Sequence, residues 1–111
     1  MPLKDALQSI IHGEVETDDA ALTRASSDAS IFAVRPQAVV HPMNTQDIQT
    51  LMNYATSHKG VSLTVRSAGT DMSGGPLSES IVVDMTSHFT RIGAIREESI
   101  SVEPGIFKRY L

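Results

Sequence analysis

The chain has 111 residues, of which 41% are hydrophobic and none is cysteine, and its formal net charge is −4. This length allows a single small domain, and the lack of cysteine excludes disulfides, thiol chemistry and cysteine-ligated metals. A negative charge with scattered Lys and Arg argues against a nucleic-acid-binding surface. No apolar run is long enough to span a bilayer and the first residues lack the apolar core of a secretory signal, so we expect a cytoplasmic location.

The first 35 residues are predicted to form a helical segment that leads into the domain. Around residues 4–12 the apolar residues have helical spacing, and Gly13 is the expected stop; they are Leu3, Leu7, Ile10 and Ile11. The acidic cluster that follows, residues 14–19, is interpreted as a solvated connector or a helix N-terminus. A metal site is the weaker alternative there, because no histidine lies at ligand spacing within the cluster.

A strand, a helix and a second strand are predicted next. Residues 38–40 form a short β-branched run between Pro36 and Pro42, which should bound the strand because proline is excluded from central ladder positions. The clearest helix runs from an Asn44 cap to Gly60, and its apolar face consists of Ile48, Leu51, Met52 and Ala55. With a strand at residues 62–65 these elements make a βαβ unit, which should be parallel and right-handed.

The stretch from Val65 to Pro76 has the composition of an anion-binding loop. It contains Arg66, glycines at 69, 74 and 75, and hydroxyl side chains at 67, 70 and 73. Glycine lets successive backbone N–H groups approach a ligand, and such groups form a concave anion site. A P-loop is excluded because Gly75 stands where its lysine must be, and the G-x-G-x-x-G spacing is absent. The alternative interpretation is a mobile Gly/Ser surface turn.

The remaining elements complete the predicted fold. Residues 81–83 are apolar without alternation, as expected of a strand buried on both faces of a parallel sheet. Residues 89–95 and 99–103 indicate a hairpin, Pro104 and Gly105 end it, and residues 106–111 resemble the first turns of a helix that the sequence does not finish. The predicted fold is α+β with an α/β-type βαβ core: a small, mainly parallel sheet flanked by helices and followed by a short antiparallel hairpin.

Four of these segments together resemble a known family. In order they are residues 36–42, residues 66–70 with Gly74-Gly75, residues 81–85 and residues 102–105. Their order and spacing resemble the FAD-binding (PCMH-type) domain of the vanillyl-alcohol oxidase / p-cresol methylhydroxylase family over roughly residues 28–111. The branch that looks most similar holds D-lactate dehydrogenases and glycolate oxidase subunits. The resemblance implies that residues 36–111 are the first part of an incomplete FAD-binding domain, preceded by the segment 1–35.

The resemblance also implies which residues bind the cofactor. The loop would hold the FAD pyrophosphate through main-chain N–H groups of Ser67 to Asp71, helped by hydroxyl groups of Thr70 and Ser73. The Pro104-Gly105 element would lie against the cofactor. The full set of implied cofactor-binding residues is Arg66, Ser67, Ala68, Gly69, Thr70, Asp71, Ser73, Gly74, Pro104 and Gly105.

Two positions refine this expectation, and one further pair matches the family without a role. Thr70 stands where covalently flavinylated relatives have histidine, so FAD should be bound non-covalently. Asp71 is unfavourable beside a diphosphate unless its carboxylate points away or is paired with Arg66 or a turn amide. The pair Ser27-Asp28 matches the family, and we assign it no chemistry.

The resemblance implies the N-terminal part of a flavin-dependent oxidoreductase that acts on a 2-hydroxy acid such as D-lactate or glycolate. The substrate-binding parts of the family lie later in the chain, so we expect no turnover by this segment and assign no catalytic residue or metal. The expected partners are FAD and the rest of the parent polypeptide, with self-association of the segment and a cytoplasmic or inner-membrane-peripheral location. The alternative function is a non-catalytic nucleotide-binding or interaction module.

Overall fold

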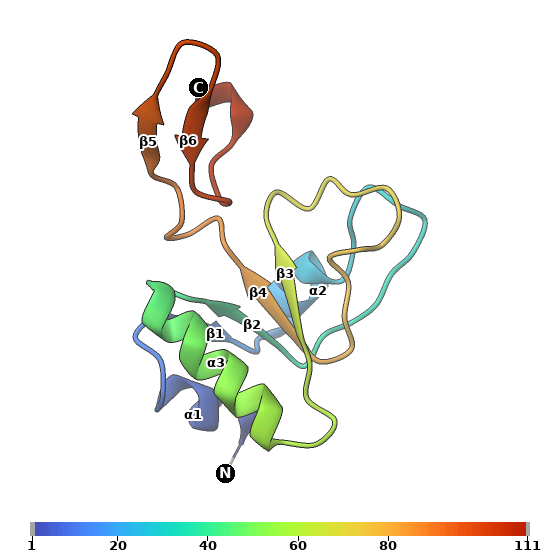
Figure 1. Ribbon diagram of the computed structural model, residues 1–111. Coiled ribbons are helices and arrows are strands. Elements are labelled where there is room, and N and C mark those ends of the chain that lie inside the picture. The colour runs from blue at the N-terminus through green and yellow to red at the C-terminus, as the bar shows by residue number, and fades with distance from the viewer. Residues whose placement is uncertain (1, 111) are drawn as a thin grey trace.

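A computed structural model describes residues 2–110 and has one four-stranded sheet, three α-helices and a separate hairpin (Figure 1). The sheet strands are β1 (Glu14–Glu16), β2 (Ala38–His41), β3 (Leu63–Arg66) and β4 (Ile81–Asp84). The α-helices are α1 (Leu3–Gln8), α2 (Asp19–Ala25) and α3 (Thr45–Ser57). The hairpin consists of β5 (Ile92–Ile95) and β6 (Ile100–Val102), and the 3₁₀ turn η1 (Lys108–Tyr110) follows.

Strand β4 occupies the centre of the sheet, whose order is β1-β2-β4-β3. It pairs in parallel with β2 and with β3, so that Ile81 lies opposite both Ala38 and Leu63. The predicted unit of β2, α3 and β3 is therefore parallel, but β4 is inserted between its two strands. Strand β1 adds an antiparallel edge next to β2. The predicted fold class, a mainly parallel sheet with helices and a hairpin, is confirmed.

The two faces of the sheet have separate cores because strand side chains alternate between faces. Val40 and Val83 pack with Leu7 of α1 and Leu51 of α3 on one face. Val39 and Val82 pack with Leu22 and Ala25 of α2 on the other face. Since helices cover both faces, the inner parallel strands β2 and β4 carry no polar alternation, as predicted for residues 81–83.

The N-terminal segment differs from the prediction in two respects. Helix α1 ends at Gln8, so Gly13 is not its stop; a Cβ on Gly13 would lie 1.9 Å from the carbonyl oxygen of His41, and glycine is needed there for close packing. Strand β1 was not predicted, because a three-residue strand with two glutamates has no β signal of its own. The acidic cluster does provide a helix N-terminus, where Asp18 caps α2 by accepting from Ala21 N–H at 3.2 Å.

The start of α3 is fixed by two side chains. Asn44 caps the helix as predicted, by accepting from the backbone N–H of Asp47 at 2.9 Å. The Asp47 carboxylate is 1% exposed and accepts from the backbone N–H groups of His12 (2.9 Å), Gly13 (2.8 Å) and Met43 (2.9 Å). Burial alone raises the pKa of Asp47, but these amides and the His12 ring outweigh it and hold the pKa below its ordinary value. Asp47 thus joins the N-terminal segment to the turn before α3.

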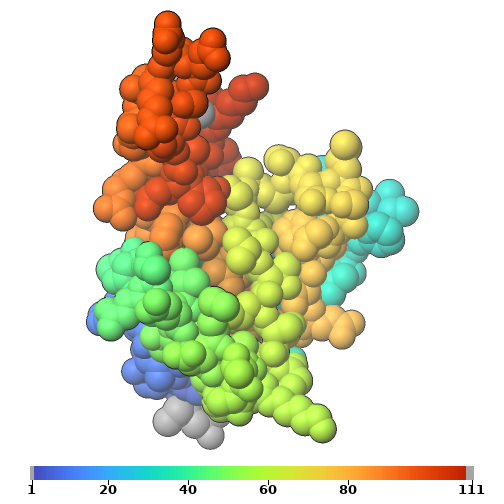
Figure 2. Space-filling view, viewed as in Figure 1, coloured from blue at the N-terminus to red at the C-terminus, as the bar shows by residue number. Residues whose placement is uncertain are grey.

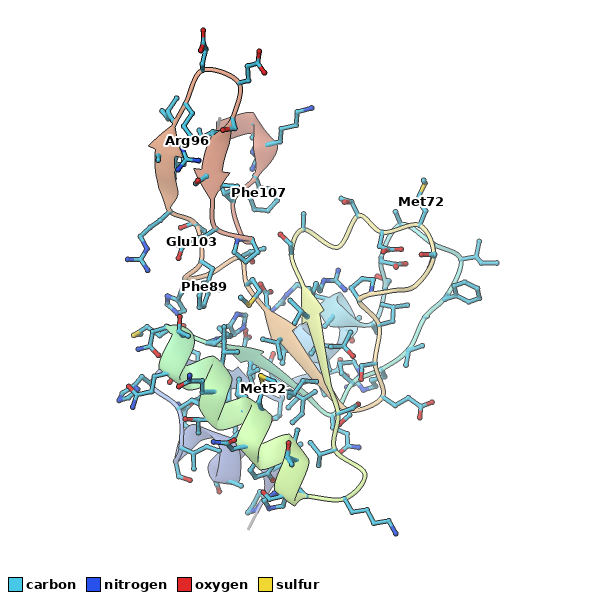
Figure 3. All side chains as sticks on the ribbon, viewed as in Figure 1. Met52, Met72, Phe89, Arg96, Glu103 and Phe107 are labelled. Atoms are coloured by element: carbon cyan, nitrogen blue, oxygen red, sulfur yellow. The ribbon has the colours of Figure 1, made fainter. Side chains whose placement is uncertain are left out.

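One part of the predicted apolar face of α3 is not covered. Leu51 is buried, but Met52 is 58% exposed and borders an apolar hollow of about 270 Å³ between α3 and the edge strand β3 (Figure 3). Val65 of β3, 60% exposed, lies at the same hollow. The prediction placed Met52 in a buried stripe because helical spacing shows which residues share a face, and only the tertiary contacts show how far that face is covered.

The hairpin projects from the rest of the molecule (Figure 2). Every residue of β5 and β6 is exposed. The first predicted strand was expected to begin at Phe89, but β5 begins at Ile92, and Phe89 instead packs into the core below the hairpin. Within residues 2–110 no helix is long and apolar enough to cross a membrane.

We expect Asp47→Ala to destabilise the chain strongly. The substitution leaves three buried or half-buried amides without their acceptor, and a lost buried hydrogen-bond partner costs about 1–3 kcal/mol, so the free energy of unfolding should fall by roughly 3 kcal/mol or more. Urea denaturation measures this change, with Asp5→Ala on an exposed part of α1 as the control.

The same carboxylate predicts a direction for the pH dependence. Because the folded pKa of Asp47 is lowered, its contribution is present above the unfolded pKa and is lost as the pH falls through the folded pKa. The stability difference between the wild type and Asp47→Asn should therefore shrink on acidification below about pH 4. A difference that grows in acid would contradict this assignment.

Candidate functional site

The predicted anion-binding stretch forms a concave loop at the carboxyl end of β3. We call residues 66–76 the anion loop. A hollow of about 530 Å³ is lined by residues 65–71 together with Gly75 and Pro76. The parallel strands β2, β3 and β4 end at His41, Arg66 and Asp84, so the loop starts at the sheet edge where open α/β sheets bind ligands. The hollow is therefore in a position suited to a ligand.

The loop carries a run of backbone donors that the protein itself does not use. Among the described residues, no acceptor takes a hydrogen bond from the N–H groups of Ser67 through Met72. The next two amides are engaged: Ser73 N–H donates to Asp71 at 2.6 Å and Gly74 N–H donates to Asp28 at 3.0 Å. Backbone N–H groups require an acceptor from somewhere, and a run of them on a concave loop suits an anion.

Two glycines give the anion loop its shape, as the sequence predicted. Gly69 and Gly74 have φ of +74° and +82°, a region that other residues rarely adopt. At Gly69 an added Cβ would also lie 2.2 Å from a terminal nitrogen of the Arg66 guanidinium, so that side chain would have to shift. Arg66 thus folds over the start of the loop, and it donates to the carbonyl of Ala25 at 3.3 Å. Its positive charge lies beside the unused amides.

The acidic residue within the loop is paired. The Asp71 carboxylate accepts from the N–H and the hydroxyl group of Ser73, each at 2.6 Å, so of the arrangements left open by the sequence the structure shows the pairing with a turn amide. The Ser73 hydroxyl and then its amide hold the pKa of Asp71 below its ordinary value, so the group stays ionised. The Ser73 hydroxyl proton, expected to face a diphosphate, is directed to Asp71. The Thr70 hydroxyl has no partner among residues 2–110 and can donate to a ligand.

The Pro104-Gly105 element meets the anion loop. Ser67 Oγ donates to the Pro104 carbonyl at 2.6 Å, so the fold brings together two elements that are 37 residues apart in the sequence. Gly105 is buried and donates from its N–H to Phe89 O at 2.7 Å. A Cβ on Gly105 would lie 1.9 Å from Met85 O, so this glycine packs the base of the hairpin against the end of β4.

A second hollow of about 230 Å³ lies on the other side of the same loop start and shares Arg66, Ser67 and Ala68 with the first. His41 lines it, is 9% exposed, and lies 2.5 Å from Glu16 through Nε2 and 3.0 Å from Ser87 Oγ through Nδ1. The His41–Glu16 contact could not be predicted from the sequence, because β1 was not predicted. The pairing of β1 with β2 is what joins them.

The other histidines also contact structural partners. His58 Nδ1 lies 2.8 Å from the Tyr54 carbonyl at the end of α3. His12 contacts Asp47, and His88 contacts Glu14. No group of three or more potential metal ligands occurs in the described part of the chain. Asp28, to which we assigned no chemistry, contacts the anion loop through Gly74.

Comparison with known families decides what kind of domain this is. A sequence model described as FAD binding domain matches residues 36–110. The chain belongs to the FAD binding domain family. FAD is the cofactor of this family, and the matched range contains the anion loop, the Pro104-Gly105 element and all three parallel strands. The resemblance inferred from four short segments is confirmed.

Curated relatives of this FAD binding domain have a common name. The chain is 34% identical over 113 residues to D-2-hydroxyglutarate dehydrogenase of Escherichia coli (strain K12), covering 98% of the chain and 11% of that protein. It is 35% identical over 104 residues to D-2-hydroxyglutarate dehydrogenase of Pseudomonas putida, covering 89% of the chain and 10% of that protein. The chain therefore spans about a tenth of the length of these relatives.

Solved structures share the fold. Physcomitrella patens BBE-like 1 has a TM-score of 0.65 at 22% identity, covering 84% of the chain and 21% of the solved chain. CrmK, a flavoenzyme of caerulomycin biosynthesis, has a TM-score of 0.65 at 22% identity, covering 85% and 20%. At this identity the likeness shows the fold alone, and it supports the arrangement of sheet, helices and hairpin described above.

The anion loop of this FAD binding domain fits a diphosphate. Unused amides, an arginine and a free threonine hydroxyl surround a hollow, while the nearby Asp71 carboxylate accepts hydrogen bonds from its own turn. In such a site main-chain donors bind the anion without the ordering of long side chains.

We expect Gly105→Ala to disrupt the base of the hairpin. The added Cβ has no space between Met85 O and Phe89 O, and backbone oxygens cannot move aside as a flexible side chain can. The variant should lose roughly 2 kcal/mol or more of unfolding free energy. Gly93→Ala, where the nearest atoms lie at 3.3 Å, is the matched control and should change stability by less than about 1 kcal/mol. Chemical denaturation of both variants measures the difference.

Proposed function

We propose that the anion loop holds the pyrophosphate of FAD. The N–H groups of Ser67 to Asp71 are the donors, the Thr70 hydroxyl adds another, and Arg66 supplies positive charge. Ala68, Gly69 and Gly74 shape the cradle, with Asp71 and Ser73 as its self-paired turn. Pro104 reaches the site through its hydrogen bond with Ser67, and Gly105 fixes that element. The observation that carries this proposal is the run of unused amides over a concave surface.

The same proposal makes the cofactor non-covalently bound. Thr70 cannot form the bond that an imidazole makes to a flavin, and the chain has no cysteine. FAD released intact by acid precipitation, with colourless protein left behind, is the expected behaviour of the flavin-loaded protein.

We further propose that the parent protein is a flavin-dependent dehydrogenase of 2-hydroxy acids. The curated relatives are D-2-hydroxyglutarate dehydrogenases, which favours a hydroxy diacid over D-lactate or glycolate as the substrate. When bound, FAD supplies the two-electron acceptor for such an oxidation. The residues of this chain bind and orient the cofactor, and none of them is assigned as a base or substrate ligand, so the segment alone should not turn over substrate.

The alternative, a non-catalytic nucleotide-binding or interaction module, is tested by affinity and activity together. Binding of ADP and FAD is expected both for the flavin-dependent dehydrogenase and for a non-catalytic nucleotide-binding module. Oxidation of 2-hydroxyglutarate by the parent protein is expected only for the dehydrogenase. A chain without nucleotide affinity would be an interaction module, and the proposed cofactor site would be wrong.

We expect Gly69→Ala to weaken FAD and ADP binding by at least about tenfold, because the loop must move to relieve the strained φ and the contact with Arg66. Gly60→Ala is a matched control: Gly60 has φ +85°, but an added Cβ meets nothing within 4 Å and the residue is outside the loop. It should lose some stability and keep its affinity. Isothermal titration calorimetry with each nucleotide distinguishes the two variants.

The apolar hollow between α3 and β3 is proposed to be covered by later parts of the parent polypeptide, since the relatives extend far beyond this region. In the isolated chain we expect self-association there, because exposed apolar surface favours association. Met52→Lys should shift the sedimentation coefficient toward that of a monomer. Met72→Lys, at an exposed position outside the hollow, should leave it unchanged. A wild-type chain that remains monomeric at high concentration would contradict this expectation.

A further inference from the structure

The last residue of α2 and the short segment that follows it contact the anion loop at its start, at Asp71 and at Gly74. Upstream, the Arg66 guanidinium donates to the carbonyl of Ala25 at 3.3 Å. Downstream, the Asp28 carboxylate accepts from Gly74 N–H at 3.0 Å, and Ala29 N–H donates to Asp71 O at 2.9 Å. These contacts bracket the amides that lack a protein acceptor. Figure 1 shows the two stretches side by side, although they are 46 residues apart at the Asp28–Gly74 contact.

Asp28 accepts three hydrogen bonds in this segment. Besides Gly74, it accepts from the backbone N–H of Ser30 at 2.8 Å and from the Ser30 hydroxyl. The Ser30 hydroxyl lowers the pKa of Asp28 most, and the amides of Ser30 and Gly74 add to this against partial burial and the charge of Asp71. The carboxylate is therefore ionised at neutral pH, and its charge is met by donors of its own surroundings.

We propose that Asp28 is a positioning residue for the diphosphate group of FAD: through the Gly74 amide it holds the anion loop in the conformation that leaves the amides of Ser67–Met72 free for the anion. The inference rests on the proposed function of this loop. Asp28 acts through Gly74, which is the first residue after the self-paired turn of Asp71 and Ser73. It is therefore distinct from the residues proposed above to contact the cofactor.

The physical reason is preorganisation. Gly74 has φ +82° and can adopt many other conformations, so without a fixed acceptor for its N–H the downstream end of the loop would be held to this segment only by the Ala29–Asp71 hydrogen bond and would be less ordered. Ordering that end would then be part of the cost of binding, which weakens affinity even when every ligand contact is kept. A hydrogen bond to an ionised acceptor is about twice as strong as one between neutral groups, which suits a carboxylate to this task.

The test uses ADP as the probe and calorimetry of the 111-residue chain. Asp28→Ala should raise the dissociation constant for ADP about tenfold, because a charged hydrogen bond that orders the loop is lost. Asp28→Asn should have an intermediate effect, because its single amide oxygen can accept from Gly74 N–H only by leaving Ser30 N–H without an acceptor, and the negative charge is lost. Asp18→Ala is the matched control. Asp18 also accepts a hydrogen bond from a backbone N–H, that of Ala21 at 3.2 Å, but it caps α2 and does not contact the anion loop. Its affinity should equal that of the wild type.

A second measurement keeps the test valid if Asp28→Ala does not fold. Hydrogen exchange in the ADP-free wild type should protect the Gly74 amide and leave the Thr70 amide unprotected. Equal exchange at both positions would overturn the inference, as would an unchanged affinity in folded Asp28→Ala or an equal loss in Asp18→Ala. A wild-type chain that does not bind ADP would instead refute the proposed function of the loop, so the two failures are distinguishable.

Discussion

The parallel pairing of β4 with both β2 and β3 is the constraint on which the rest of the structure depends. Because β4 lies between the two strands of the βαβ unit, all three end at the same edge of the sheet, at His41, Arg66 and Asp84. The chain leaving β3 must then form a loop over that edge before it returns to β4. The anion loop is this return path, so the same pairing that buries Val82 and Val83 also places the stretch that we propose to bind the cofactor.

Aspartates that accept backbone amides organise the irregular parts of this domain. Asp18 caps α2, Asp47 joins the N-terminal segment to α3, Asp71 closes the turn in the anion loop and Asp28 accepts from Gly74. Each carboxylate satisfies N–H groups that no strand or helix can use. In a chain with a net charge of −4, this arrangement also lets acidic side chains lie near the proposed anion site, since nearby N–H and hydroxyl groups donate hydrogen bonds to their carboxylates.

The uncovered regions are the surfaces that we propose are covered by a longer polypeptide. The hairpin β5–β6 is exposed throughout, and the hollow beside Met52 and Val65 has an apolar lining without a cover. The curated relatives are about ten times as long as the matched segment. This FAD binding domain segment therefore contains the proposed diphosphate site, while surfaces that a longer polypeptide would bury remain open.

The sequence by itself determined the elements whose signal is local. Capping, proline geometry and positive φ are local properties, so a few residues were enough to predict four features. These are the Asn44 cap, the strand between Pro36 and Pro42, the β-branched run at residues 81–83 and the glycines of the anion loop. The order of these segments was enough to indicate the family. The residues of the proposed diphosphate cradle were predicted from that order.

Only the tertiary structure decided what depends on residues far apart in the chain. Strand β1 exists because β2 offers it an edge, and its own three residues gave no signal. Asp47 and Asp28 gain their roles from amides 34 and 46 residues away, and Met52 is exposed because no segment within residues 2–110 covers its side of α3. Such contacts are set by how the strands pair and which faces the helices cover, and a local pattern of residues does not contain that information.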